Sequence, residues 1–275
     1  AWDHLATQLT VGETYFFREK PALELLKKVL IPDFFKRKLQ QNVFRIWSAG
    51  CSSGEEPYTL AIILKEASQH FGPFNFEILA TDLNPTALEK ALNGHYSAWS
   101  FRETSETVKQ KYFVSKNNVL EINQEIKDLV RFKKFNLKHL IDRNSLAFEH
   151  PFDVIFCRNV LMYFDSDTIS KIGLAFHRNL CNGGWLITSQ VELNDTYFAT
   201  FVKQQYEGHF FYQKQQSKSQ PFDQKVNLAV EVIKNQNTSS QEQSVKTNEK
   251  SWKQLLSDNR NIKIPYSGFS LEEQT

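Results

Sequence analysis

The sequence predicts an α/β protein built on a doubly wound parallel sheet, and three observations carry this prediction. Short apolar runs over 43–49 and 76–82 are each followed by a polar turn and then by a segment with helical periodicity. The stretch 151–165 predicts a further buried strand with a polar end, and it leads into another helical segment. Strands that alternate with helices in this way form parallel sheets with helices on their faces.

Composition argues against several classes of protein. The chain has 275 residues, 41% of them hydrophobic, and a formal net charge of +2. A charge this small does not favour a nucleic-acid surface, which is normally strongly basic. The three cysteines lack CxxC spacing and the seven histidines lack ligand spacing, so we expect neither disulfides nor a metal. No run of about 18 apolar residues and no leader-like segment occur, so we expect a cytoplasmic chain that does not insert into a membrane.

Local signals place the elements of the first half of the chain. Residues 1–42 are predicted to be a helical segment, in which Pro21 suits a first turn. The helix after the first strand is expected to begin at Pro57 and to end at Gly72. After the second strand, residues 84–94 hold a capping asparagine, a proline in the first helical position and a terminating glycine. Each of these two strands therefore has its helix.

The second half adds an inserted β-rich segment and the remaining strands. We place the insertion at about 97–128, where two short β-like runs occur, and expect 129–135 to return to the main sheet. Residues 183–190 predict another strand, and 201–215 predict two strands joined near a Glu-Gly turn.

A change of composition near residue 214 sets the expected domain organisation. The residues from 215 to 275 are rich in Gln, Ser, Asn and Lys and poor in large apolar side chains, so we expect a disordered linker or tail. The main domain is then 43–214, preceded by the helical segment 1–42.

The loop "SAGCSSGEEPY", residues 48–58, is the most informative stretch. A glycine loop between a strand and a helix is typical of a site for a nucleotide moiety, and Asp82 at the end of the next strand suits the ribose hydroxyls. An ordinary tight turn is the alternative interpretation. The loop lacks the GK[ST] of a phosphate-binding loop, and Glu55 and Glu56 would repel a pyrophosphate at the helix start. S-adenosylmethionine carries a sulfonium and an ammonium but no phosphate, and therefore fits better. Helix-dipole compensation in the first turn is the alternative explanation for Glu55 and Glu56.

Four segments in order resemble the chemotaxis-receptor methyltransferases of the CheR type: 14–19 (TYFFRE), 46–62, 78–96 and 152–164 (FDVIFCRNVLMYF). The resemblance covers about residues 11–214. It implies a seven-stranded S-adenosylmethionine-dependent methyltransferase sheet with a small inserted β-subdomain. It also implies that glutamate side chains of receptors accept the methyl group, giving methyl esters and S-adenosylhomocysteine for sensory adaptation.

The same resemblance implies the site residues. Arg18 and Tyr163 are the expected catalytic residues, Arg18 because a guanidinium can hold the acceptor carboxylate by two hydrogen bonds. A glutamate is already ionised at neutral pH, so no general base is needed. Gly12 stands where the family often has Asn, and "SQVE" (189–192) keeps only the family's Glu192. The expected cofactor-binding residues are Gly12, Thr14, Arg18, Gly50, Glu56, Asp82, Asn136, Leu137, Arg158 and Asn159.

Structural explanations remain open for three of these residues. Arg18 could form a surface ion pair, Tyr163 could be an aromatic at the edge of the core, and Arg158 could pair with Asp153 or Asp165.

Two other functions also remain open. A non-catalytic cofactor-binding or signalling scaffold would share the fold, whereas a nucleic-acid methyltransferase would normally have an NPPY motif or a catalytic cysteine. The expected partner is the cytoplasmic domain of a chemoreceptor or another sensory receptor, and the short turn at 115–118 does not favour docking of a receptor's C-terminal peptide.

Overall fold

The computed structural model describes residues 13–36, 43–116, 119–141 and 148–215. The chain divides into two units, 1–217 and 218–275, and every described residue belongs to the first. The predictions for 1–12, including Gly12, and for 37–42 and 216–275 lie outside the described residues.

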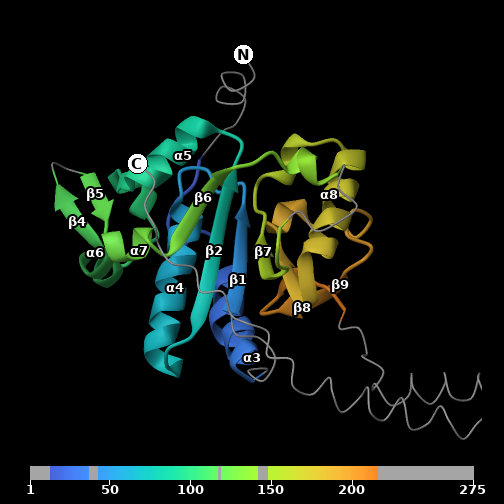
Figure 1. Ribbon diagram of the computed structural model, residues 1–275, viewed down its shortest axis with the longest axis horizontal. Helices are drawn as coiled ribbons and strands as arrows, with labels where there is room; N and C mark the ends of the chain where they lie inside the picture. The colour runs from blue at the N-terminus through green and yellow to red at the C-terminus, as the bar shows by residue number, and fades with distance from the viewer. Residues whose placement is uncertain (1–12, 37–42, 117–118, 142–147, 216–275) are drawn as a thin grey trace, which may run out of the picture. The chain divides into compact units, whose positions relative to one another are not determined.

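A seven-stranded sheet forms the centre of the first unit (Figure 1). Its strand order is β6-β2-β1-β7-β8-β10-β9. β1 is parallel to β2 on one side and to β7 on the other, and β10 is antiparallel to β8 and β9. From β1 the chain first adds β2 and β6 on one side, and then returns to add β7, β8, β10 and β9 on the other side. The strands are β1 (Val43–Ala49), β2 (Asn75–Asp82), β6 (Val130–Lys134), β7 (Phe152–Phe156), β8 (Leu180–Ile187), β9 (Val202–Tyr206) and β10 (His209–Gln213).

Alternating side chains of the strands supply two hydrophobic cores, one on each face of the sheet. Ile46 belongs to the core that also contains residues of α4 (Glu55–Phe71). Its neighbour Trp47 belongs to the opposite core, which contains residues of α8 (Ser166–Asn179). All five residues of β7 are buried, as expected for a strand covered on both faces.

The helix that precedes β1 contains a π turn. It runs as α2 (Lys20–Leu25), η1 (Leu26–Leu30) and α3 (Ile31–Lys36), and the N–H of Ile31 donates to the carbonyl of Leu26 inside the π turn. Pro32 has no N–H to continue the α-helical ladder, which accounts for the wider turn at this point. The prediction that Pro21 lies in the first turn is confirmed, but residues 14–19 are not helical.

Several predicted elements agree with the structure closely, and others differ at one end. Strands 43–49 and 76–82 correspond to β1 and β2, and α5 (Pro85–Asn93) begins and ends as expected. The Asn84 side chain accepts from the N–H groups of Thr86 and Ala87, and Gly94 ends the helix with a φ of 66°. The helix α4 starts at Glu55, two residues earlier than predicted. The strand expected within 151–165 is only β7, because the polar end becomes a loop and the short helix η4 (Leu161–Tyr163).

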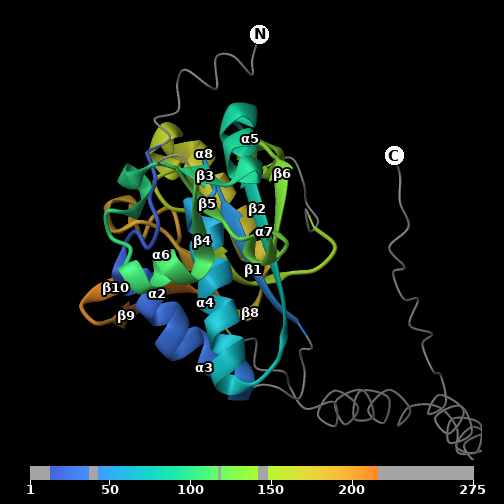
Figure 2. The same cartoon turned by 90° about the vertical axis from the view of Figure 1, so that its left-hand side faces the viewer.

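The inserted segment forms a second, three-stranded sheet, seen at the front in Figure 2. Its strands are antiparallel and occur in the order β3-β5-β4. Short helices join them to each other and to the main sheet. The elements are β3 (His95–Tyr96), η2 (Ala98–Phe101), α6 (Glu106–Tyr112), β4 (Phe113–Lys116), β5 (Val119–Ile122) and α7 (Gln124–Lys127). None of the helices in the described ranges is long and apolar enough to cross a membrane.

Candidate active site

The predicted site residues gather at the carboxyl ends of four neighbouring strands. The glycine loop follows β1, Asp82 ends β2, Asn136 follows β6, and Arg158 follows β7. The chain reverses its direction of growth between β1 and β7, and open α/β sheets bind ligands in the crevice at such a switch point. The sheet order therefore brings together segments that are more than 100 residues apart in the sequence.

The glycine loop follows β1 as a tight turn held against β2. Gly50 and Gly54 have φ values of 83° and 93°, in the left-handed region that favours glycine. The N–H groups of Gly50 and Cys51 donate to the Thr81 carbonyl at 2.7 and 2.9 Å. A β-carbon at Gly50 would lie 2.3 Å from Cγ2 of Val160. Glycine is needed there because the loop after β7 approaches this closely.

Asp82 joins the glycine loop to the tip of β2. Its Oδ2 accepts from the N–H of Ser52 and its Oδ1 from the N–H of Asn84, both at 2.8 Å. Burial raises the pKa of Asp82, while hydrogen bonds from backbone N–H groups act in the opposite direction. A carboxylate oxygen can accept more than one hydrogen bond, so this oriented carboxylate has acceptor capacity for a pair of hydroxyls.

Arg158 lies at the centre of the site. Its side chain is 4% exposed, and its Nε donates to Oε2 of Glu56 at 2.7 Å. One terminal nitrogen donates to the Arg18 carbonyl at 2.8 Å and lies 3.8 Å from the Glu19 carboxylate. Two residues predicted as separate cofactor ligands, Glu56 and Arg158, therefore form a buried ion pair. Arg158 also connects the loop after β7 to the segment that contains Arg18. Asp165, one partner considered from the sequence, is the N-cap of α8.

Glu192 organises the loop that follows β7. Its carboxylate accepts from the backbone N–H groups of Asn159, Val160 and Leu161 at 2.7, 2.8 and 2.8 Å. It also accepts from the Ser189 hydroxyl at 2.6 Å, within a capping box. Asn159 has a φ of 59°, so this anion holds a left-handed residue next to Arg158. Glu192 was not among the predicted site residues, although the S-x-x-E spacing of 189–192 is a capping-box signal.

Glu55 has more contacts than helix-dipole compensation requires. Its side chain is buried and accepts from the hydroxyls of Ser53 and Ser100 at 2.8 and 3.0 Å. The hydroxyl of Tyr96 in turn donates to the Ser53 carbonyl at 2.8 Å. Burial raises the pKa of Glu55. This carboxyl group therefore ties the glycine loop to the inserted segment.

Arg18 lies on a strained turn and presents its side chain towards the protein surface. The flanking residues Phe17 and Glu19 have φ values of 60° and 59°, which are unusual for side chains of this size. The Phe17 N–H donates to Oγ1 of Thr59 at 3.2 Å, and the Arg18 carbonyl is held by Arg158. The half-buried Arg18 guanidinium donates to the Glu13 carbonyl and lies 5.6 Å from the centre of the Tyr15 ring. The main chain at Arg18 is thus fixed from both sides.

The other predicted residues lie in the segments after β6 and β7 and in the segment before α2. Asn136 caps the short helix η3 (Leu137–Leu140) by accepting from the N–H of Lys138, and Leu137 is buried. Tyr163 is 48% exposed on η4, so it is not part of the core. Thr14 is half-buried in the segment before α2.

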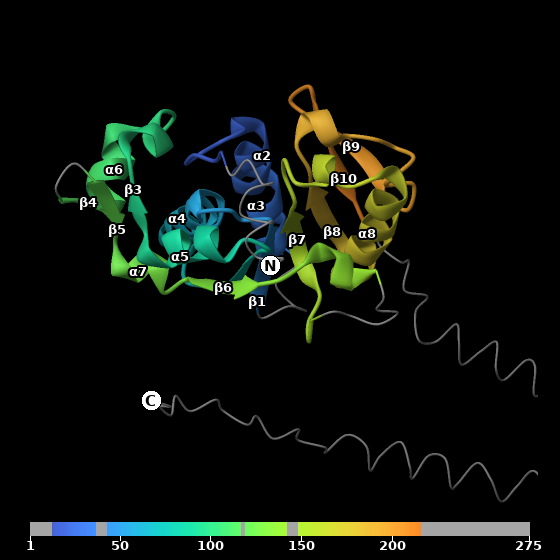
Figure 3. The same cartoon turned by 90° about the horizontal axis from the view of Figure 1, so that it is seen from above.

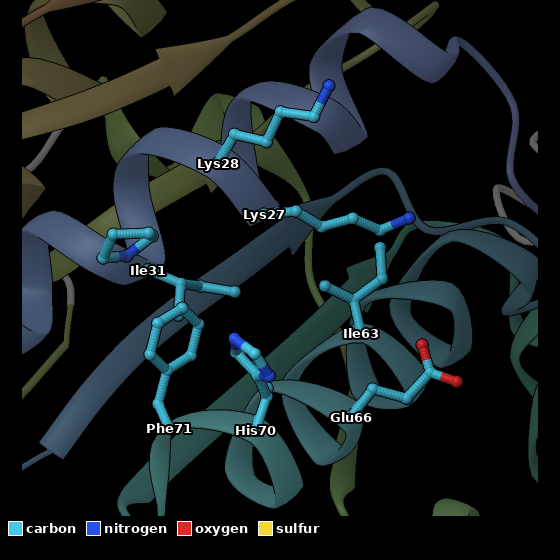
Figure 4. A pocket seen from close by; sticks show the side chains of 9 residues that line it. Lys27, Lys28, Ile31, Ile63, Glu66, His70 and Phe71 are labelled. Carbon is cyan, nitrogen blue, oxygen red and sulfur yellow. The ribbon is translucent and has the colours of Figure 1, made fainter.

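A separate hollow of about 430 Å³ lies between the helix before β1 and the second half of α4 (Figure 4). The side chains of Ile31, Ile63 and Phe71 line it, with Lys27 and Glu66 nearby. The glycine loop is at the opposite end of α4, so this hollow is not the predicted site. In the parts of the chain that the structure describes, no group of three or more His, Cys, Asp and Glu residues could hold a metal ion.

The residues present fit S-adenosylmethionine. The loop has close backbone approach at Gly50, an oriented carboxylate at Asp82, and carboxylates rather than a lysine at the start of α4. Together with the order of the seven strands, these features define the S-adenosylmethionine-dependent methyltransferase fold.

Comparisons with known proteins identify the family within this class. The family described as "CheR methyltransferase, SAM binding domain" matches residues 12–200, and the chain belongs to it. A chemotaxis protein methyltransferase of Borreliella burgdorferi is 35% identical over 68% of this chain and 66% of its own length. Chemotaxis protein methyltransferase 2 of Vibrio cholerae is 36% identical over 67% of this chain and 63% of its own length. The chain thus spans slightly less than two thirds of these relatives.

Proposed function

We propose that this protein transfers a methyl group from S-adenosylmethionine to glutamate side chains of a chemotaxis or other sensory receptor, releasing S-adenosylhomocysteine and a glutamyl methyl ester. The observation that carries the proposal is the buried Arg158 network at the switch point. Through it, one side chain links the loop after β7, the first turn of α4 and the segment that presents Arg18. The names of the relatives, chemotaxis protein methyltransferases, support the choice of substrate.

The methyl donor would be held by groups from each strand end. Asp82 would accept the ribose hydroxyls with the lone pairs that its backbone partners leave, and Asn136 and Leu137 would flank the adenine. The Glu56 carboxylate also accepts from the Ser48 hydroxyl at 2.7 Å, so it is oriented before any ligand arrives. Contacts from Gly12, Thr14, Gly50, Arg158 and Asn159 would complete the set. When bound, this cofactor supplies an electrophilic methyl group on a sulfonium.

Arg18 would position the acceptor, and Tyr163 would border it. The guanidinium can exchange its bond to the Glu13 carbonyl for two parallel bonds to an acceptor carboxylate, which are stronger because both partners are charged. Because the main chain at Arg18 is already fixed, only the Arg18 side chain has to be ordered when the acceptor binds. No proton has to be removed from an ionised glutamate.

The domain organisation follows the same proposal. Residues 43–214 would form the methyltransferase domain with an insertion at about 97–128, preceded by the helical segment 1–42 and followed by the tail 215–275. The chain would act in the cytoplasm on the cytoplasmic part of its receptor. We do not expect nucleic acid or a metal to take part, nor docking of a receptor's C-terminal peptide on the insertion.

A methylation assay tests this function. The 275-residue chain is incubated with radiolabelled S-adenosylmethionine and membranes that contain chemoreceptors, and base-labile label on the receptor is measured. We expect methyl esters with the wild-type chain and at least a tenfold lower rate with Arg18→Ala, whose lost clamp leaves the acceptor unpositioned. Calorimetry with S-adenosylhomocysteine accompanies the assay. Binding without receptor label would contradict the proposed substrate, and no binding would favour a scaffold.

A further inference from the structure

Trp99 is exposed at the edge of the inserted segment although the two residues that follow it are buried. It lies on η2, where Ser100 and Phe101 are buried, yet 60% of Trp99 is accessible to solvent. Tryptophan exposes a large apolar surface, and it is among the residue types that dominate binding energies at protein interfaces. Such a side chain left in water points to a binding surface.

The Trp99 ring is held rigidly by Arg102. The guanidinium carbon of Arg102 lies 4.3 Å from the centre of the Trp99 ring and 3.5 Å from the centre of the Tyr15 ring. The same guanidinium donates to the Trp99 carbonyl at 3.0 Å and forms an ion pair with Glu13 at 3.3 Å. A surface ordered in advance loses little conformational entropy when a partner covers it.

This stack lies next to the proposed acceptor clamp. Arg18 shares the Tyr15 ring with Arg102, at 5.6 Å from its centre. The two segments are joined by a hydrogen bond of 2.9 Å from the Phe16 N–H to the Ser100 carbonyl. Figure 3 shows the segment before α2 reaching towards the insertion. A chain whose glutamate meets Arg18 must therefore pass within a few side chains of Trp99.

Exposed apolar residues also occur on a second segment that is connected to Arg18. Met162 and Tyr163 are exposed in the loop after β7, which Arg158 ties to the Arg18 carbonyl. Val191, beside Glu192, is 78% exposed. Trp99, Met162, Tyr163 and Val191 are four of the nine large hydrophobic residues that are exposed in the described part of the chain. An anion-binding side chain connected to two segments with exposed apolar residues matches an acidic acceptor residue flanked by apolar ones.

We propose that the stack of Tyr15, Trp99 and Arg102 is the docking surface for the acceptor polypeptide, and that Trp99 covers apolar side chains next to the acceptor glutamate. The proposal rests on the proposed function, because it takes its occupant from that reaction. The charge of the surface agrees with this occupant: Arg102 is paired with Glu13, whereas the Arg18 guanidinium donates to a neutral carbonyl and keeps its charge for an anionic acceptor. The surface determines recognition of the protein substrate and leaves binding of the methyl donor unchanged.

Steady-state methylation of a purified chemoreceptor cytoplasmic domain tests the proposal. We expect Trp99→Ala to raise the KM for the receptor about tenfold or more at an unchanged kcat. Trp99→Phe, which keeps an aromatic ring against Arg102, should recover most of the loss. The Kd for S-adenosylhomocysteine should stay within twofold in both variants. Leu92→Ala is the matched control, since Leu92 is 61% exposed on α5, and its KM should equal that of the wild type.

The possible outcomes distinguish a wrong docking surface from a wrong proposed function. If Trp99→Ala leaves the KM for the receptor unchanged while the wild-type chain is active, the docking surface is wrong and the proposed function stands. If the KM is unchanged and the melting temperature falls, Trp99 belongs to packing within this chain, which also overturns the proposal. If the wild-type chain gives no methyl ester, both proposals fail.

Discussion

The substitution Glu192→Gln separates the charge of this side chain from its shape. In the wild type, Oε2 accepts from the Asn159 N–H at 2.7 Å and from the Ser189 hydroxyl at 2.6 Å, while Oε1 accepts from the N–H groups of Val160 and Leu161. A glutamine keeps one acceptor oxygen and replaces the other with an NH₂ group. If its oxygen stays on the Val160 side, an NH₂ donor faces the N–H of Asn159.

The expected cost follows from that geometry. The Ser189 hydroxyl can rotate to accept, but the N–H groups of Asn159 and Ser189 cannot, so two partly buried donors lose their partner. An unsatisfied donor costs about 1–3 kcal/mol, and the remaining bonds lose charge assistance. We therefore expect the free energy of unfolding to fall by about 2–4 kcal/mol. In a domain of this size each kcal/mol lowers the melting temperature by roughly 2–4 °C.

The same change should also slow the reaction. The loop held by Glu192 contains Asn159 and continues to Tyr163, and a shift of about 1 Å in such a loop can cost on the order of 100-fold in rate. Urea denaturation and steady-state methylation measure the two effects. Glu89→Gln is the matched control, because Glu89 is exposed on α5. A Glu192→Gln variant with wild-type stability and wild-type kcat would refute the assigned role of the carboxylate.

Two further predictions concern the glycine loop. Gly50→Ala should destabilise the fold by roughly 1–3 kcal/mol, because the new methyl group would overlap Val160 at a positive φ. Adding Val160→Ala should restore part of the stability, and urea denaturation of both variants measures this. If the two substitutions instead cause additive losses, the proposed overlap is wrong. Glu55 gives a pH dependence: burial raises its pKa above the ordinary value of 4.5, so the folded chain holds this proton more tightly than the unfolded chain. The contribution of Glu55 to stability therefore falls as pH rises through the interval between the two pKa values. Glu55→Gln should show a smaller decrease in unfolding free energy over that interval, and an identical pH profile in the two proteins would rule out this contribution.

Local patterns were enough to predict the elements whose causes are local. The asparagine cap, the proline and the terminating glycine of α5 lie within eleven consecutive residues, and β1 and β2 are short apolar runs next to turns. The predicted extent of β7 was too long, because an apolar run does not reveal where a strand leaves the sheet. There the chain turns at the left-handed Asn159, which Glu192 holds from 33 residues away.

The fold class, the glycine loop with its acidic residues, and the family that these motifs resemble could all be predicted from local patterns in the chain. The pairing of the charges could not, because it depends on the tertiary structure. Arg158 and Glu56 are 102 residues apart, and they meet because the sheet places β7 beside β1. The exposure of Trp99 and its stacking on Arg102 and Tyr15 likewise depend on two distant segments that pack together. Contacts of this kind are set by strand order and packing, which leave no local pattern in the chain.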